Sequence, residues 1–227
     1  MSQLRSATRD LETELLAGAR WVIGIDEVGR GALAGPVSVG VCIVDADTRR
    51  PPEGLTDSKL LTPTRREAMV AELASWGAAR AVGHASPAEI DAVGIIAALR
   101  LAALRALAVA AQGLGEEDAC AAACAIILDG SHNWLVPTLD LFTPTETHAW
   151  CHAPVTMQVK ADQQCAVVAA ASVLAKVERD RIMVEYPDPG YGFAAHKGYA
   201  AAVHREALQR LGPSDFHRRS WRLLPTP

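Results

Sequence analysis

The sequence predicts an α/β fold in which helices cover both faces of a mixed sheet. Two stretches rich in valine and isoleucine come first, within residues 21–44, and helical and strand patterns alternate from residue 62 onwards. The chain has 227 residues, of which 50% are hydrophobic and 21% charged, as expected for one packed domain of ordinary size.

The N-terminal elements follow from apolar runs and helix-start signals. A short polar helix over residues 6–19 leads into a first strand over residues 20–26, and residues 37–44 alternate like a second strand. A proline-containing loop follows. The next helix begins either at Thr62, which Pro63 follows, or at Thr64, which has Glu67 as a capping-box partner.

A strand over residues 79–85 precedes the clearest helix start in the chain. Ser86 fits the cap position, Pro87 the first helical position, and Glu89 closes a capping box. Apolar residues then recur at three-four spacing, which predicts one buried face formed by positions 90, 93, 97, 101, 104, 108 and 111. Gly113 and Gly115 are expected to end this helix.

Two further strands are expected over residues 125–128 and 154–159. A long helix then extends from about Asp162 to Glu185, and its small residues at 169–172 would let it lie close on a sheet. Beyond a turn rich in proline and glycine, one or two helices reach about Leu211.

Composition and local charge limit the classes of partner. No uncharged run is long enough to span a bilayer, and the N-terminus lacks signal-peptide organisation, so we expect a cytoplasmic protein without membrane contact. Residues 196–227 carry six basic and two acidic residues, a local charge of +4 in a chain of net charge −4. This segment suits nucleic acid, but charge alone does not distinguish it from a solvated helical surface.

The five cysteines form an odd set in apolar surroundings, typical of reduced packing residues: Cys42, Cys120, Cys124, Cys151 and Cys165. Cys151-His152, with His148 upstream, is the one group that invites a test for zinc. Because no second pair at zinc-finger spacing accompanies it, we do not expect a structural zinc.

Acidic residues stand where three of the predicted strands end: Asp26 with Glu27, Asp129, and Asp162. Taken singly, Asp129 could be a turn residue before a glycine, and Asp162 could cap the long helix. Ligands of such sheets gather at the carboxyl ends of strands, so the four carboxylates are expected to converge and to need divalent cations. Two ions about 4 Å apart would clamp the attacking and leaving oxygens of a phosphodiester.

Asp26 and Glu27 are adjacent, and adjacent strand residues point to opposite faces. Either the chain bends at this point, or one of the two contributes through its backbone carbonyl. The turn Gly29-Arg30-Gly31 follows directly, and its glycines let the backbone approach a ligand closely with free N–H groups.

Ordered blocks along the chain carry a resemblance to a known family. They are residues 23–34 (IGIDEVGRGALA), Asp57-Ser58-Lys59, Asp129-Gly130, Lys160-Ala161-Asp162, residues 169–183 and residues 191–199. Together they resemble bacterial type 2 ribonuclease H, ribonuclease HII, and the resemblance covers nearly the whole chain, from about residue 22 to residue 220.

The resemblance implies a ribonuclease H-like fold, with a mixed five-stranded sheet flanked by helices. Residues 1–190 would form the catalytic domain and residues 191–227 a C-terminal helical, substrate-binding extension packed on the core. The implied protein is a monomeric endoribonuclease that cleaves RNA in RNA–DNA hybrids and incises duplex DNA at embedded ribonucleotides. It would use two Mg²⁺ or Mn²⁺ ions and leave 3′-hydroxyl and 5′-phosphate ends.

Family roles transfer to this chain residue by residue. The metal-binding catalytic acids would be Asp26, Glu27, Asp129 and Asp162. The residues that contact substrate would be Gly29, Arg30, Gly31, Ser58, Lys59, Lys197 and Tyr199. Among these, the Gly-Arg-Gly turn would read the 2′-hydroxyl at the RNA-to-DNA junction, the group that separates RNA from DNA locally. Tyr199 would stack on the sugar there, and the two lysines would lie near phosphates.

The chain departs from the family pattern at three places. Ala161 stands where glycine is usual, the linker before Tyr191 is shortened, and Ala201 replaces a threonine. Two other functions remain open, namely a hybrid-binding module without turnover and a nuclease for plain DNA on the same fold. The presence of all four acids argues against the first, and the Gly-Arg-Gly turn with Lys197-Gly198-Tyr199 argues against the second.

Overall fold

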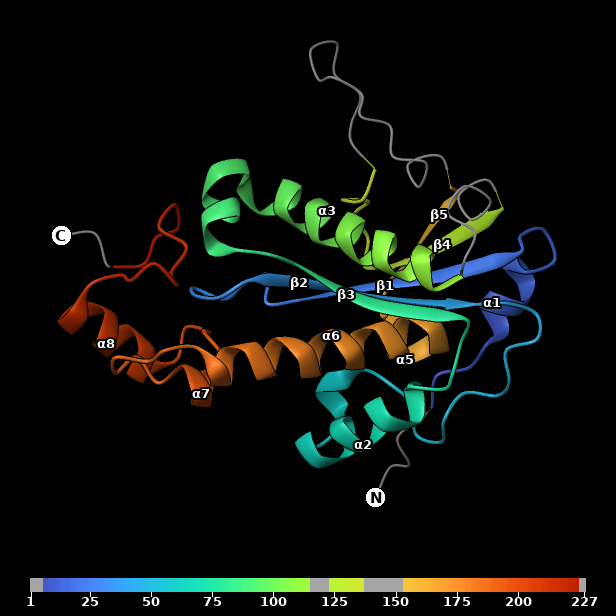
Figure 1. Cartoon of the computed structure of the whole chain (residues 1–227), viewed down its shortest axis with the longest axis horizontal. Helices are drawn as coiled ribbons and strands as arrows, with labels where there is room; N and C mark the ends of the chain where they lie inside the picture. The colour runs from blue at the N-terminus through green and yellow to red at the C-terminus, as the bar shows by residue number, and fades with distance from the viewer. Residues whose placement is uncertain (1–5, 115–122, 137–152, 225–227) are drawn as a thin grey trace, which may run out of the picture.

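Figure 1 shows the computed structural model of the chain, a sheet lying between two layers of helices. The structure describes residues 6–114, 123–136 and 153–224. Its sheet has the strand order β3-β2-β1-β4-β5. The strands are β1 (Trp21–Val28), β2 (Val37–Val44), β3 (Ala79–Ala85), β4 (Cys124–Asp129) and β5 (Val155–Gln158). The β1–β2 and β2–β3 pairs are antiparallel and the other two are parallel, which confirms the predicted mixed five-stranded sheet.

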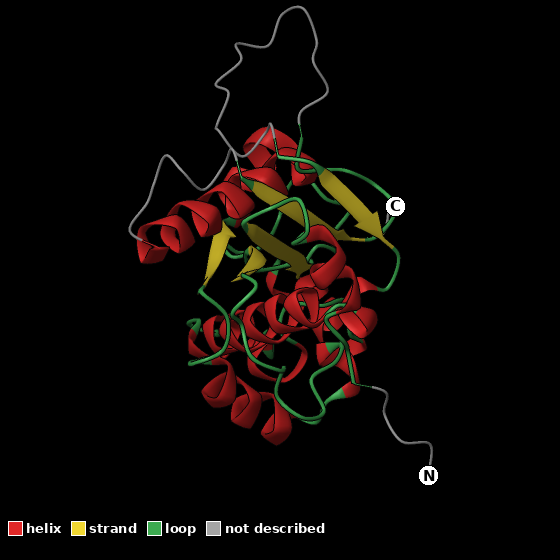
Figure 2. Cartoon of the chain, turned by 90° about the vertical axis from the view of Figure 1, so that its right-hand side faces the viewer, coloured by secondary structure: helices red, strands yellow, loops and turns green. Residues whose placement is uncertain are grey.

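Helices cover both faces of the sheet, as predicted (Figures 1 and 2). α3 (Pro87–Leu114) packs on one face, and α6 (Ala166–Glu185), with α2 (Pro63–Leu73) against it, packs on the other. The shorter elements are α1 (Asp10–Leu15), the 3₁₀ helix η1 (Ser58–Leu60), α5 (Ala161–Gln164), α7 (Phe193–His196) and α8 (Ala202–Leu211).

Alternate residues of β1 enter two separate apolar cores. Ile23 and Ile25 belong to the core under α3, and Val22 belongs to the core under α6. Gly24 faces α6 so closely that an added Cβ would lie 2.5 Å from the carbonyl carbon of Val167. The same alternation turns Asp26 towards α6 and Glu27 towards the opposite face.

The predicted helix starts are confirmed at two places. The Thr62 side chain accepts a hydrogen bond from the Arg65 N–H and Pro63 occupies the first turn of α2, so Thr62 rather than Thr64 is the cap. At α3, the Ser86 and Glu89 side chains exchange hydrogen bonds with each other's backbone N–H, which is the expected capping box.

β1 extends two residues beyond its predicted end at Asp26. Pairing with β2 continues without a break from Val22–Val44 to Val28–Ser38, so Asp26 and Glu27 lie inside a regular strand. The ladder with β2 outweighs the low strand propensity of the two acids. The chain therefore does not bend at this pair.

The N-terminal helix and the long helix after Asp162 are both shorter than predicted, and one contact explains why both begin later. Thr8 forms a bridge with Cys165, and the Ala166 N–H donates to the Thr8 carbonyl. Thr8 therefore pairs with another segment instead of joining α1, and Cys165, which is extended, separates α5 from α6. This contact between distant segments overrides two local helix signals.

The predicted buried stripe of α3 is confirmed at Ile90 and Ala111, but between them it is out of phase with the buried face. Gly94 has a φ of 77° and interrupts the helix, so the residues after it restart at a different rotation. Val93 is 55% exposed, and the buried face continues as residues 98, 99, 102, 103, 106, 107, 110 and 111. By length and composition α3 could cross a membrane, but this face packs on the sheet as a core helix.

The cysteine prediction holds for the part of the chain that the structure describes. Cys42, Cys124 and Cys165 are buried and reduced. Cys120, and the zinc candidates His148, Cys151 and His152, lie outside the described residues.

Candidate active site

The parallel strands β1 and β4 bring the predicted acids to one edge of the sheet. Ile25 pairs with Leu128 in the ladder, so the next residues, Asp26 and Asp129, are neighbours across the two strands. Asp162 lies on α5, directly after β5. The Asp129 carboxylate accepts a hydrogen bond from the Ala161 N–H at 2.8 Å, which ties α5 to the end of β4.

Burial and mutual charge raise the pKa values of these acids. Burial raises the pKa of Asp26 well above its ordinary value, and the charges of Glu27, Asp129 and Asp162 add to this, against a hydrogen bond from Ser172. Burial, with Asp57 and Asp129, raises the pKa of Asp162 to about 6. Burial also raises the pKa of Glu27, although Arg30 acts against it. The carboxylates are thus close enough to repel one another.

Lys59 is surrounded by the same acids. Burial tends to lower its pKa, but the charges of Asp57, Asp26, Asp162 and Asp129 outweigh this and raise it. η1 holds this lysine in place because the Asp57 carboxylate caps it and accepts from the Lys59 N–H at 2.9 Å.

Asp57 is an acid of this cluster that the sequence analysis did not select. It is buried, it helps to raise the pKa of Asp162, and it accepts from the Gln163 amide at 3.3 Å. Its place beside Ser58 and Lys59 was the available sequence signal.

Ser58 lies behind the acids, on the α6 side. It is buried, and its hydroxyl lies 3.0 Å from that of Ser172, the residue that acts against the rise in the pKa of Asp26. Ser172 therefore links Ser58 to Asp26. Its small size, needed for close packing of α6, was its visible feature in the sequence.

The donor chemistry of this cluster fits divalent metal ions. Its oxygen ligands are those that Mg²⁺ and Mn²⁺ prefer, and a cation would relieve the repulsion that raises the pKa values. As they stand, the carboxylates point to separate donors: Asp26 to the Glu27 N–H at 2.8 Å, Glu27 to Arg30 at 3.4 Å, and Asp129 to the Ala161 N–H. Within the described residues, no three His, Cys, Asp or Glu side chains are already grouped to hold an ion.

Two turns meet beside the acids and form what we call the two-turn platform, residues 29–31 and 197–199. The Gly29 N–H donates to the Tyr199 hydroxyl at 3.2 Å, and the Leu33 N–H donates to the Gly198 carbonyl at 2.9 Å. Gly29 has a φ of 81°, and an added Cβ would lie 2.0 Å from Arg179. Only glycine fits there. Tyr199 is 36% exposed, so part of its ring remains open to a ligand.

Lys160 and Lys197, which both stand in the blocks that carry the family resemblance, adopt a left-handed backbone conformation. Lys160 has a φ of 58° and precedes α5, and Lys197 has a φ of 53° and ends α7. Ala161 itself begins α5 with its N–H held by Asp129. The strained position is therefore Lys160, and alanine is accommodated at 161 where the family usually has glycine.

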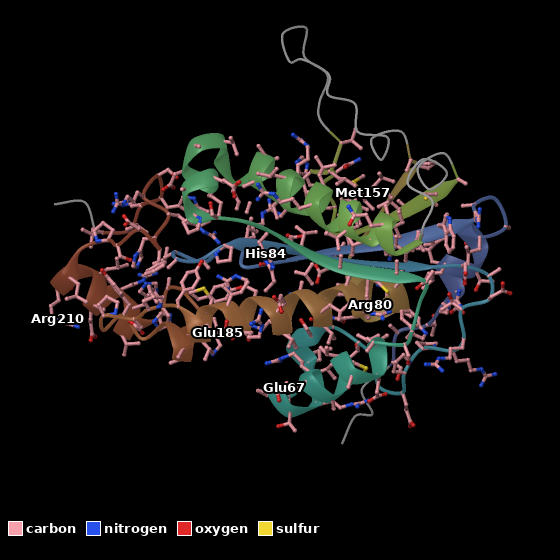
Figure 3. The ribbon with its side chains drawn as sticks, in the orientation of Figure 1. Glu67, Arg80, His84, Met157, Glu185 and Arg210 are labelled. Carbon is pink, nitrogen blue, oxygen red and sulfur yellow. The ribbon has the colours of Figure 1, made fainter. Side chains whose placement is uncertain are left out.

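A groove of about 810 Å³ leads from the platform along α6 to α2. Its lining combines basic and acidic side chains with Tyr199: Arg66, Lys176, Arg181 and Lys197 are the basic residues, and Glu67, Asp180 and Glu185 are the acids. Figure 3 labels Glu67 on α2 and Glu185 near the end of α6. The groove opens beside the residues predicted to contact substrate.

The chain was compared with known proteins, and the family model for Ribonuclease HII matches residues 23–224. The Ribonuclease HII of Streptomyces avermitilis is 47% identical over 223 residues, which cover 96% of this chain and 84% of that protein. The ribonuclease H2 structure from Pyrococcus horikoshii OT3 has a TM-score of 0.60 at 23% identity, covering 89% of this chain and 94% of the other. The structure of Bst-RNase HIII in complex with Mn²⁺ has a TM-score of 0.57 at 20% identity, covering 92% of this chain and 70% of the other. The two structures show the ribonuclease H-like fold.

Proposed function

The chain belongs to the ribonuclease HII family, endoribonucleases that cleave the RNA of RNA–DNA hybrids, and we propose that it also incises duplex DNA at embedded ribonucleotides. The observation that carries this proposal is the contact between the acid cluster and the two-turn platform. Glu27 lies near the end of β1, Gly29 follows directly after that strand, and Arg30 of the platform donates to Glu27 at 3.4 Å, so a ribonucleotide on the platform would present its phosphate to the acids.

We assign the acids Asp26, Glu27, Asp129 and Asp162 as the metal ligands. When bound, two Mg²⁺ or Mn²⁺ ions would activate water and stabilise charge on the scissile phosphate, leaving 3′-hydroxyl and 5′-phosphate ends. Because β1 stays regular through Val28, one member of the Asp26-Glu27 pair would contribute through its backbone carbonyl. Lys59 balances charge within the cluster.

We assign the platform to recognition of the ribonucleotide. Main-chain groups of Gly29, Arg30 and Gly31 would hydrogen-bond the 2′-hydroxyl, and the exposed part of Tyr199 would stack on the adjacent sugar. Lys59 and Lys197 would lie near phosphates, and Ser58 would support the site from behind.

On this proposal residues 191–227 are the substrate-binding extension of a catalytic domain formed by residues 1–190. α7 and α8 pack on the end of α6 through a third apolar cluster that includes Met183, Phe193 and Leu208. The groove beside Lys197 would then hold the sugar-phosphate backbone of one nucleic-acid strand. The expected enzyme is a cytoplasmic monomer whose partners are RNA–DNA hybrids and duplex DNA that contains ribonucleotides.

Substitution of Asp129 tests the metal site. Asp129→Asn keeps an oxygen that can accept from the Ala161 N–H, so the fold should persist, but the variant loses a charged ligand. We expect cleavage of a labelled hybrid in Mg²⁺ to fall by about 100-fold or more. Circular dichroism controls for folding, and analysis of the wild-type products should show 3′-hydroxyl and 5′-phosphate ends. Near wild-type cleavage by the folded variant would remove Asp129 from the site.

A further inference from the structure

Two arginines, both with 0% exposure, lie beneath the two-turn platform. Arg218 follows α8, and Arg179 lies on α6. Figure 1 shows the segment after α8 returning to the end of the sheet where α3 begins. Arg218 is one of the six basic residues of segment 196–227, and its complete burial removes it from the basic surface predicted there.

Arg218 uses its whole guanidinium group to hold main-chain carbonyls of the first turn. It donates to Gly29 at 2.6 Å, to Arg30 at 2.8 Å, to Gly35 at 3.1 and 3.2 Å, and to Pro36 at 3.2 Å. The planar fork of arginine suits such a fixed set of acceptors, and a lysine ammonium cannot reproduce it.

Arg179 joins the residues between the first turn and β2 to the second turn. It donates to the Pro36 carbonyl at 2.9 Å, the Ala34 carbonyl at 3.2 Å and the Lys197 carbonyl at 3.0 Å. Its guanidinium carbon also lies 5.3 Å from the centroid of the Tyr199 ring. One side chain thus contacts the residues on both sides of the Gly29–Tyr199 hydrogen bond.

Burial of two cations side by side is costly. Burial lowers the pKa of both, and the charge of Arg179 lowers that of Arg218 further, yet arginine stays protonated in proteins. All the hydrogen bonds described for Arg218 are to carbonyl oxygens. A simple tether between the C-terminal segment and the core could use apolar contacts at lower cost, so this arrangement indicates a demand for exact backbone geometry.

We propose that Arg218 and Arg179 are positioning residues that set the two-turn platform for recognition of a single ribonucleotide. They fix the carbonyl oxygens of Gly29, Arg30 and Lys197, and thereby aim the N–H groups of the first turn and the ring of Tyr199. Their buried charge also favours a phosphate over the platform. This inference rests on the proposed function of the platform.

Arg218→Lys tests the role of the guanidinium fork while the charge remains. We expect kcat/KM on a duplex with one ribonucleotide to fall by about 10- to 100-fold, because small displacements of positioning groups have effects of this size. Cleavage of a long RNA–DNA hybrid, where 2′-hydroxyls are available in many registers, should fall less than about threefold. Mn²⁺ affinity measured by calorimetry should stay unchanged, because Arg218 contacts none of the four acids.

Arg219→Lys is the matched control. Arg219 is the next residue, and its exposed side chain pairs with Asp215 at 2.7 Å, away from the platform. This variant should behave as wild type on both substrates.

Asp91→Asn tests the same inference if Arg218→Lys does not fold. The Asp91 carboxylate, near the start of α3, accepts from the Arg219 N–H at 2.8 Å and the Ser220 N–H at 3.0 Å, and so anchors the segment that carries Arg218. We expect a change in the same direction, of about threefold.

The outcomes separate this inference from the proposed function. Selective loss on the single-ribonucleotide duplex, with Mn²⁺ affinity and thermal midpoint retained, supports positioning. Equal loss on both substrates, or no loss in a folded Arg218→Lys or Asp91→Asn variant, would overturn it and leave a structural tether. If the wild-type enzyme does not incise that duplex at all, the proposed function fails and the inference fails with it.

Discussion

At the scale of single residues, the acid cluster places charge where folding alone would not favour it. Asp26 and Asp162 are 6% and 4% exposed, and both have raised pKa values because of burial and neighbouring carboxylates. Lys59 and the Ser172 hydroxyl offset only part of this. Such conflict between function and stability is common at catalytic sites.

The raised pKa of Asp162 predicts a pH-dependent cost in stability. Its pKa is about 6 in the folded chain against 3.8 ordinarily, so its favourable contribution is present below pH 4 and is lost as pH rises to about 6. In EDTA at pH 7, Asp162→Asn should therefore be more stable than wild type by on the order of 2 kcal/mol, and at pH 4 the two should be alike.

Urea unfolding at the two pH values measures this difference. Asp215→Asn is a suitable control, because that acid is 93% exposed and pairs only at the surface with Arg219. Added Mg²⁺ should stabilise wild type at pH 7 by binding the native state. Equal stability of Asp162→Asn and wild type at pH 7 in EDTA would contradict the raised pKa.

At the scale of elements, glycines let the helices lie directly on the sheet. Gly24 and Gly40 face α6, and Gly83 faces α3, where an added Cβ would lie 2.1 Å from the Ala102 carbonyl oxygen. Gly40 pairs with Asp26 in the ladder and faces Ala171, the neighbour of Ser172. The distance between β2 and α6 therefore determines how Ser172 meets Asp26.

Gly40→Ala should damage both stability and activity. An added Cβ would lie 2.1 Å from the Ala171 carbonyl oxygen, so α6 must move. Overpacking of this kind costs about 1–3 kcal/mol, and the displaced Ser172 would no longer support Asp26. Chemical denaturation and hybrid cleavage measure the two effects. Gly113→Ala, whose Cβ would meet Ala79 at 3.8 Å, should leave both near wild type.

At the scale of the whole molecule, local patterns predicted the five strands, the two helix layers and the capping box at Ser86. They failed where a distant segment decides the structure, as at Cys165, which bridges to Thr8. The phase of α3 was missed because one glycine, Gly94, restarts the helix.

The residues of the candidate site also fall into those that local sequence patterns reveal and those that they do not. The four acids could be selected because each stands close after an apolar run in the sequence, a pattern visible in neighbouring residues. Arg218 could not be found, because its acceptors at Gly29 to Pro36 lie more than 180 residues away and its neighbours in the sequence are polar. Hydrogen bonds between a side chain and a distant backbone leave no periodic signal.

Incision of an end-labelled DNA duplex that carries one ribonucleotide tests the central claim most directly, with an all-DNA duplex as control and with Mg²⁺, Mn²⁺ or EDTA present. Because the acid cluster lies beside the two-turn platform, we expect a single metal-dependent cut on the 5′ side of the ribonucleotide and no cut in the control. Cleavage of a long hybrid without any cut in that duplex would contradict the role of Arg30 and Tyr199, and cleavage of neither substrate would contradict the catalytic assignment of the acids.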